Sequence, residues 1–206
     1  MDNMSRYGFR WVGSNGGTVH PKPRLVRVAT GYSGSEGAVT IDLNIGDPVM
    51  ALATGYVAHC DVGSPVYGVI CGVQQYWDGT KLVVGTKVPA GQGAYSTNLD
   101  RMTFVSIIPA QDQMFEVDVD DIVTATTEAG YIALIGENCD LSWNGVSATA
   151  KGWPKLDISD HKASTAQWRI IDISKTRDNF DPAGANYKLI VTANEVFDAP
   201  NYTAGV

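Results

Sequence analysis

Short runs of apolar residues, separated by turns rich in glycine and proline, recur along the chain. In the stretch Ile45–Gln74, a turn at Gly46–Pro48 precedes three such runs, at 49–52, 56–59 and 66–73. The runs are rich in β-branched and aromatic residues and are too short for typical helices. We therefore expect three consecutive antiparallel strands here, arranged as a β-meander.

The same pattern continues to the end of the sequence. Further strands are predicted at 38–43, 81–84, 102–109, 113–121, 131–135, 138–141, 167–173 and 187–193. The best candidate for a helix is the segment 122–135, although its threonines weaken it and Gly130 breaks it, after which 131–135 has the pattern of a buried strand. The pattern predicts an all-β protein, in the form of an antiparallel β-barrel or β-tulip-like domain with an extended amino-terminal arm and little helix.

The strand predicted at 113–121 has the strictest alternation. Three apolar residues, beginning with Phe115, alternate there with the carboxylates of Glu116, Asp118 and Asp120. One face of the strand should be buried. A metal or acid–base site is the alternative interpretation of the other face, but a catalytic pair needs one carboxyl group in an apolar pocket. We interpret the three carboxylates as a solvated face.

Residues 1–31 are predicted to form an extended arm, separate from a β domain at 32–206. Three aromatic residues alternate there with Gly8 and Arg10, so an extended conformation places the rings on one face and Arg10 on the other. The segment either forms a first hairpin of the β domain or docks on another protein, in which case removing residues 1–20 leaves a folded domain. The candidate partner-binding residues are Arg6, Tyr7, Phe9, Arg10 and Trp11.

Composition suits this fold, and the positive charge is concentrated in the arm. The 206 residues include 22 glycines and 9 prolines, and 18% are charged, which fits many short strands better than helices. Residues 1–30 carry a formal charge of +4, which leaves −11 for residues 31–206, because the whole chain carries −7. The negative charge of residues 31–206 repels the phosphates of nucleic acid, so we expect no direct binding of nucleic acid.

The three cysteines, Cys60, Cys71 and Cys139, follow neither a disulfide framework nor a zinc-ligand spacing. We expect all three to be reduced and the chain to fold in a reducing cytoplasm, with a Cys60–Cys71 bridge as the alternative. The sequence has no apolar window long enough to span a bilayer, so no membrane association is expected.

The segment Asp157–Lys162 brings an aspartate and a histidine close in sequence to several serines, which are the residue types of a hydrolytic triad. None of these serines lies in a GxSxG motif, and proximity in sequence does not establish a triad. We therefore predict no catalytic residues, no metal ligands and no cofactor.

Several short segments follow one another in a distinctive order. They are YGFRWV at 7–12, GDPV at 46–49, YGVICGVQ at 67–74, FEVDVD at 115–120, IGENCDL at 135–141, WRIIDIS at 168–174 with DNFDP at 178–182, and YKLIVTANE at 187–195. In this order they resemble a family of virion structural proteins of tailed bacteriophages, the head decoration or cement proteins. The resemblance extends over residues 6–197 and rests on the order of the segments.

The resemblance implies a β-barrel or β-tulip-like body bound to the outer surface of the capsid and assembled in the host cytoplasm. The implied partners are the major capsid protein and neighbouring copies of the chain, as in a homotrimer. Such a protein would stabilise the shell by bridging capsid subunits, without catalysis or a cofactor. The alternatives are another virion component, such as a tail or adaptor protein, and a hydrolase with a sparse active site.

Overall fold

The computed structural model describes residues 8–15, 21–28, 42–53, 55–78, 80–90, 102–120, 124–143, 153–177, 179, 181–183 and 187–196. These residues form fourteen strands and one short helix, and every strand pair within the sheets is antiparallel. The all-β class predicted from the sequence is confirmed. The strands form two six-stranded sheets, here called sheet A and sheet B, and one two-stranded pair.

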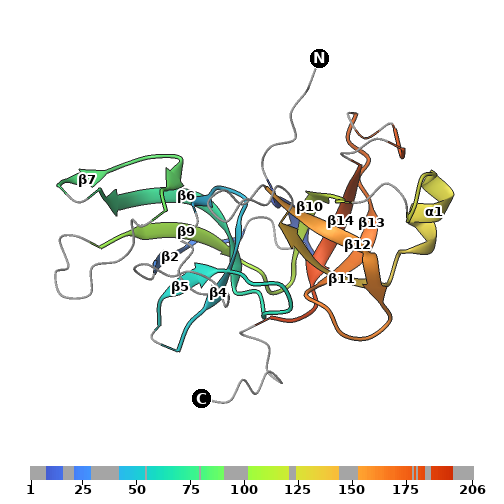
Figure 1. Ribbon diagram of the computed structural model, residues 1–206, viewed down its shortest axis with the longest axis horizontal. Helices are drawn as coiled ribbons and strands as arrows, with labels where there is room; N and C mark the ends of the chain where they lie inside the picture. Colours follow the sequence, from blue (N-terminus) through green and yellow to red (C-terminus); the bar gives the residue numbers. More distant parts are fainter. Residues whose placement is uncertain are drawn as a thin grey trace.

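Sheet A lies on the right in Figure 1. Its strands, in spatial order, are β1 (Arg10–Ser14), β10 (Gln113–Asp118), β14 (Lys188–Ala193), β13 (Trp168–Ile173), β11 (Asn138–Trp143) and β12 (Pro154–Lys162). Five of these strands come from the second half of the chain, and only β1 comes from near its start.

Sheet B lies on the left in Figure 1. Its strands, in order, are β2 (Arg24–Arg27), β9 (Phe104–Pro109), β6 (Gly68–Trp77), β4 (Pro48–Ala51) and β5 (Val57–His59), and β7 (Leu82–Val83) pairs with the far end of β6. The separate pair consists of β3 (Leu43–Asn44) and β8 (Lys87–Val88).

The three strands predicted at 45–74 are present in the structure, but the β-meander predicted for them is wrong. Strand β4 lies between β5 and β6, whereas a meander would place β5 in the middle. After β5 the chain crosses to the other side of β4, where the Tyr67 amide donates to the Val49 carbonyl over 2.8 Å. Apolar periodicity marks each strand but carries no information on which neighbours it pairs with.

Neither sheet closes into a barrel through a continuous ladder in the described part of the chain. In sheet B the two outer strands approach each other at one isolated parallel bridge, between Val28, next to β2, and Val57 of β5. In sheet A an isolated parallel bridge joins Leu156 of the outer strand β12 to Val119, which follows β10, the strand next to β1. The expectation of an all-β fold is therefore met, but no closed barrel is found.

Each sheet covers its own apolar core. The core of sheet A contains the largest buried side chains, among them Phe115, Tyr131 and Trp168. The core of sheet B is made of smaller residues such as Val49 and Ile70. Aromatic side chains bury about 150–250 Å² each, so the core of sheet A buries more apolar surface per residue than the core of sheet B.

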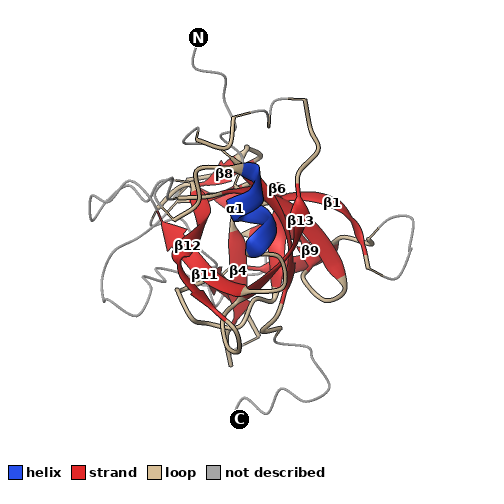
Figure 2. Ribbon diagram, turned by 90° about the vertical axis from the view of Figure 1, so that its right-hand side faces the viewer, coloured by secondary structure: helices blue, strands red, loops and turns tan. Residues whose placement is uncertain are grey.

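Helix α1 (Glu128–Ala133) covers the far end of sheet A, in front of the strands in Figure 2. It begins after Thr127, whose side chain accepts a hydrogen bond from the Gly130 amide. Tyr131 is fully buried and stacks on Tyr187 with ring centroids 4.3 Å apart. The strand predicted at 131–135 is therefore wrong, because the cap and this buried ring hold the segment in a helix.

The described parts of the segment 1–31 lie within the two sheets. Strand β1 is the outermost strand of sheet A, and β2 is an outer strand of sheet B. No helix among the described residues combines the length and the apolar character needed to cross a bilayer.

Candidate partner-binding site

The segment at the start of β1 places Phe9 in the core of sheet A. The Phe9 ring is 2% exposed and stacks on Trp168 with centroids 4.3 Å apart. It also meets Phe115 edge to face at 6.5 Å. Such aromatic pairs add to the free energy gained from burial alone. In this structure the Phe9 ring is packed in the core of its own chain.

Gly8 and Phe9 also contact the turn before β4. The Phe9 amide donates to the Gly46 carbonyl over 2.9 Å. Gly8 has φ +58°, and a Cβ atom there would lie 2.6 Å from the Gly46 oxygen and 2.7 Å from Cγ of Pro154. Only glycine fits this left-handed and crowded position without strain.

Arg10 points to the other side of β1 and pairs with Glu116. Its Nη2 lies 2.7 Å from Oε1 of Glu116, which is only 5% exposed. The second carboxylate oxygen accepts a hydrogen bond from Ser174, and Thr176 Oγ1 lies 3.5 Å away. The predicted solvated face is wrong for Glu116 and also for Asp118, which is 7% exposed. Strand β1 and the segment after β13 cover this side of β10.

Trp11 is half-buried, and its Nε1 donates to Oε1 of Gln113 over 2.9 Å. Of the five candidate partner-binding residues, Phe9, Arg10 and Trp11 thus all contact sheet A of their own chain. Arg6 and Tyr7 lie outside the described residues.

The outer edge of β1 pairs with no strand in the part of the chain that the structure describes. Val12, on this strand, is 38% exposed, and the register shifts between Trp11 and Gly13. Bulges twist an edge and discourage unplanned pairing with other chains. Among the described strands this edge therefore has no neighbour, and the irregularity in β1 discourages pairing with other chains.

A groove of about 470 Å³ lies beside the Arg10–Glu116 pair. Its walls are formed by Glu128 and Ile132 of α1, the segment 172–176, Asn179, Pro182 and Tyr187. Ser174 and Thr176 belong to both the groove and the Glu116 network. Asp172 pairs with the exposed Lys175 at 3.4 Å, so charge on this wall is partly balanced. The groove has the volume of a site for a small ligand or a partner side chain.

The residues of the hypothetical hydrolytic triad are arranged in a different way. Asp157 accepts a hydrogen bond directly from the Ser159 hydroxyl over 2.7 Å, and Nδ1 of His161 lies 3.0 Å from the Ile158 carbonyl. In a triad the histidine stands between the serine and the carboxylate. Among the described residues, no group of three or more His, Cys, Asp or Glu side chains is placed to hold a metal ion.

All three cysteines are free thiols in the structure. Burial raises the pKa of Cys60, and it raises that of Cys139 to about 12, with neighbouring carboxylates acting in the same direction. The pKa of Cys71 is also raised by burial. Since the thiolate is the reactive form, these side chains are poor nucleophiles.

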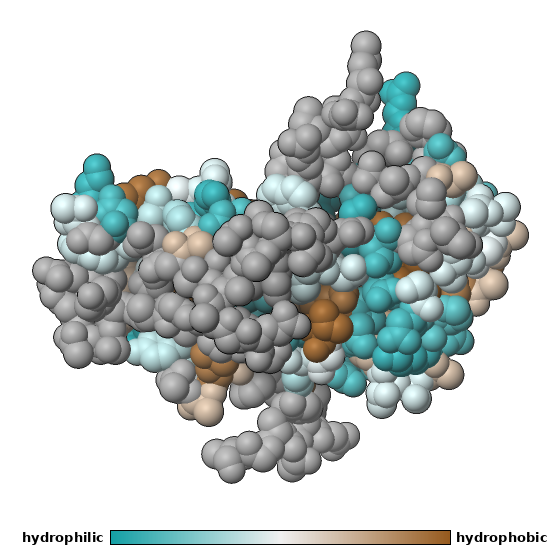
Figure 3. Space-filling view, in the orientation of Figure 1, coloured by the Kyte–Doolittle hydropathy of each residue, from teal (hydrophilic) through white to brown (hydrophobic). Residues whose placement is uncertain are grey.

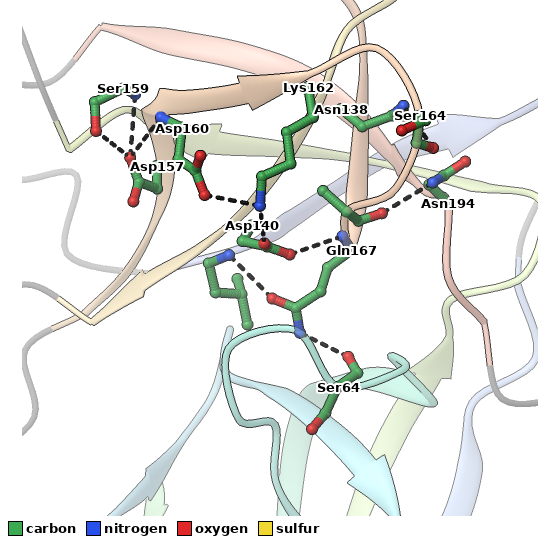
Figure 4. A network of polar contacts seen from close by, with 12 residues as sticks. Ser64, Asn138, Asp140, Asp157, Ser159, Asp160, Lys162, Ser164, Gln167 and Asn194 are labelled. Atoms are coloured by element: carbon green, nitrogen blue, oxygen red, sulfur yellow. Dashed lines mark hydrogen bonds and ion pairs between the residues drawn. The ribbon is translucent and has the colours of Figure 1, made fainter. Parts of the chain in front are cut away.

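Gln167 joins the two halves of the molecule (Figure 4). Its buried side chain donates to the carbonyls of Ser64 and Asp61, over 2.6 and 2.8 Å, and accepts from the Leu141 amide over 3.0 Å. Its own amide donates to Asp140 over 3.1 Å. The loop after β5 is thereby held against sheet A, and both halves are kept in a fixed relation.

The surface carries its apolar groups singly. Figure 3 shows hydrophilic side chains gathered over sheet A and only small, separate apolar patches on the same face. The most exposed large apolar residues are Val84, Leu25, Val62 and Ile132, which belong to different elements or loops. Single exposed apolar residues are common on soluble surfaces and do not mark a site by themselves.

No family model matches the sequence, and neither a curated protein nor a solved structure is significantly similar to it. Functional inference therefore rests on the chain's own sequence and structure.

The sequence predicted neither the partners of Glu116 nor the role of Gln167. One signal for the first was present, since a lone arginine on the polar face of one strand matches carboxylates on the polar face of another. Gln167 gave no such signal. A buried glutamine is recognised only when the backbone groups that it satisfies are known.

Proposed function

We propose that this chain is a head decoration protein of a tailed bacteriophage, which binds the outer surface of the capsid and bridges its subunits. Its action is binding and not catalysis. The partners are the major capsid protein and neighbouring copies of the chain.

One observation carries this proposal. The segments that resemble the decoration proteins form a single connected framework in the fold. Phe9, Phe115 and Trp168 pack together, and Gly46 accepts the Phe9 amide. The Gly136 amide likewise donates to the Ile170 carbonyl over 2.9 Å. Segments that lie far apart in the sequence therefore contact one another within a single fold. This supports the interpretation that the resemblance in their order reflects a similar fold.

The mechanism follows from mass action. A protein that binds only the expanded shell stabilises it by RT ln(1 + [L]/Kd) for each occupied site. A rigid body is suited to this task, because little conformational freedom is lost on binding. The bonds of Gln167 between the two halves, and the docking of β1, provide that rigidity.

The test is binding to capsids of a tailed phage that encodes the chain. Purified protein is mixed with expanded and with unexpanded capsids, and bound protein is measured by co-sedimentation. We expect saturable binding to expanded capsids and a higher temperature of shell disruption. Cryo-electron microscopy then locates the bound copies. Failure to bind either form would refute the proposal, and density confined to the tail would favour a tail or adaptor protein.

A further inference from the structure

We infer that β1 is exchanged between neighbouring copies of this chain, so that each copy inserts Phe9 into sheet A of the next. The inference rests on the proposed function, because an array on a capsid is the setting that holds copies side by side. The partner is a second copy of the same chain, which completes its neighbour's core.

Sheet A has a distinct acceptor slot for this strand. The other five strands of the sheet all lie between Gln113 and Ala193, and β1 is added to their edge from far away in sequence. The floor of the slot is formed by the rings of Phe115 and Trp168. Glu116 and Gln113 receive Arg10 and Trp11 at its rim. A slot of this kind accepts the same strand from any identical chain.

The contacts of β1 are concentrated on the slot. Asn15, directly after the strand, donates its amide to the Asp112 carbonyl over 2.9 Å and its side chain to Thr192 over 3.2 Å. Gly8 packs on Pro154 of β12, which also belongs to sheet A. The contacts of Gly8 and Phe9 with the Gly46 carbonyl reach outside sheet A, both to the turn before β4. The segment is therefore held as one unit, which is the condition for exchange as one unit.

The connection to the rest of the chain is long enough for exchange. Residues 15–23 join β1 to β2, and β2 belongs to sheet B. Nine residues span roughly 30 Å when extended. Pro21 and Pro23 favour an extended path. The strand of one copy can thus reach the slot of an adjacent copy without changes within β2.

Closed and exchanged forms contain the same contacts, so their difference lies mainly in the entropy of association. In dilute solution this term favours the closed monomer. On a surface where neighbours are held in place, the effective concentration is on the order of mM, and exchange becomes favourable. We therefore expect exchange in the decorated array and in concentrated protein, but not in dilute protein.

Two variants, each with one added cysteine beside the three native thiols, test the inference. Ser14 and Gln113 face each other in the β1–β10 ladder. The adjacent bond from Asn15 to Asp112 makes the pair of the closely spaced, non-hydrogen-bonded type. Protein carrying Ser14→Cys is mixed with protein carrying Gln113→Cys, incubated on capsids or at high concentration, and oxidised. A covalent dimer between the two variants forms above the level of random collision only if β1 of one copy occupies the slot of the other.

Three controls define the outcome. The double variant Ser14→Cys/Gln113→Cys must form an internal bridge in dilute protein, which shows that the geometry allows it. Ser14→Cys mixed with the exposed Lys175→Cys measures random collision, and wild type measures the native thiols. If Gln113→Cys fails to fold, Gly13→Cys with Met114→Cys replaces the pair.

We expect at least ten times more dimer from the mixed pair than from the collision control. Dimer at the level of that control, both on capsids and in concentrated solution, would overturn the inference. Decoration without cross-linking would leave the proposed function standing and refute exchange. Cross-linking in concentrated solution without decoration would support exchange and refute the proposed function.

Discussion

Phe9 and Trp168 stack face to face at 4.3 Å although they lie near opposite ends of the described chain. The segment at the start of the first strand therefore completes a core to which β10–β14 contribute most of the residues, with Cys60, Val66 and Val69 from earlier in the chain. This relation couples any change in the amino-terminal segment to the stability of sheet A.

Phe9→Ala should destabilise the protein strongly. Removing a buried ring leaves a cavity between Phe115 and Trp168, at a typical cost of about 3–5 kcal/mol. Val12→Ala, in the same strand but 38% exposed, should cost less than about 1 kcal/mol. Urea denaturation of both variants measures the difference. A Phe9→Ala variant as stable as wild type would mean that the arm is separate from the fold, as the sequence alone suggested.

Gly8→Ala and Gly55→Ala separate backbone strain from steric conflict. Both glycines have positive φ, +58° and +79°, so each substitution should cost about 1–2 kcal/mol through the backbone. Gly55 has open space around it, whereas a Cβ at Gly8 would meet the Gly46 carbonyl and Pro154. We expect Gly8→Ala to lose about 1–3 kcal/mol more than Gly55→Ala in thermal unfolding. Equal losses would show that Gly8 is not held against that turn.

Glu116→Ala should be more harmful than Arg10→Ala. Loss of Glu116 removes the acceptor for Ser174 from a buried site, which costs about 1–3 kcal/mol. The Arg10 side chain is 56% exposed, so its ion pair is screened by water and contributes about 0–1 kcal/mol. A double-mutant cycle on chemical denaturation gives the coupling between the two. The reverse order of effects would contradict the buried position of Glu116.

Much of the fold could be predicted from periodicity. Strands β9, β10, β13 and β14 coincide with apolar runs bounded by turn residues, because burial of one face imposes that pattern. The order of strands could not be predicted. The central position of β4 depends on where the chain returns after β5, and that is decided by contacts distant in sequence.

In the candidate site, too, the sequence predicted which face a residue lies on but not which residues it contacts. Alternation placed Phe9 and Arg10 on opposite faces, and in the structure one is buried and the other exposed. It could not show that the slot for Phe9 lies in the same chain. For the same reason Glu116 was assigned to solvent, since the strand that covers it is encoded far from β10.

Asp47 is a buried acid at the turn that receives the Phe9 amide. It is 1% exposed, and Oδ2 accepts from the Asn44 amide over 2.8 Å. Within the described residues, its Oδ1 has no hydrogen-bond partner. Burial raises the pKa of this carboxyl from 3.8 to about 7, with Asp42 acting in the same direction and the bonds from Asn44 opposing. Ionisation in this site is therefore unfavourable.

This pKa predicts that stability falls as pH rises from about 4 to 7. In that range the folded protein keeps the Asp47 proton while the unfolded chain releases it, so the unfolded state is favoured progressively. The slope from one such group is at most about 1.4 kcal/mol per pH unit, and it vanishes above pH 7, where both states are ionised. Asp120 and Glu195, whose pKa values are also raised by burial, add to the slope with the same sign.

Asp47→Asn should remove most of this pH dependence. The amide oxygen can still accept the Asn44 amide, but the side chain no longer titrates. The variant should be less stable than wild type at pH 4, because its amide N–H groups replace Oδ1 at a position without an acceptor, and should gain on wild type toward pH 8. Asp78→Asn is the matched control, since Asp78 is exposed and its pKa is lowered by the amides of Lys81 and Thr80, so its contribution has the opposite sign. Chemical denaturation at each pH gives the free energy of unfolding. If wild type and Asp47→Asn have parallel profiles between pH 4 and 7, Asp47 is not the buried acid that the structure describes.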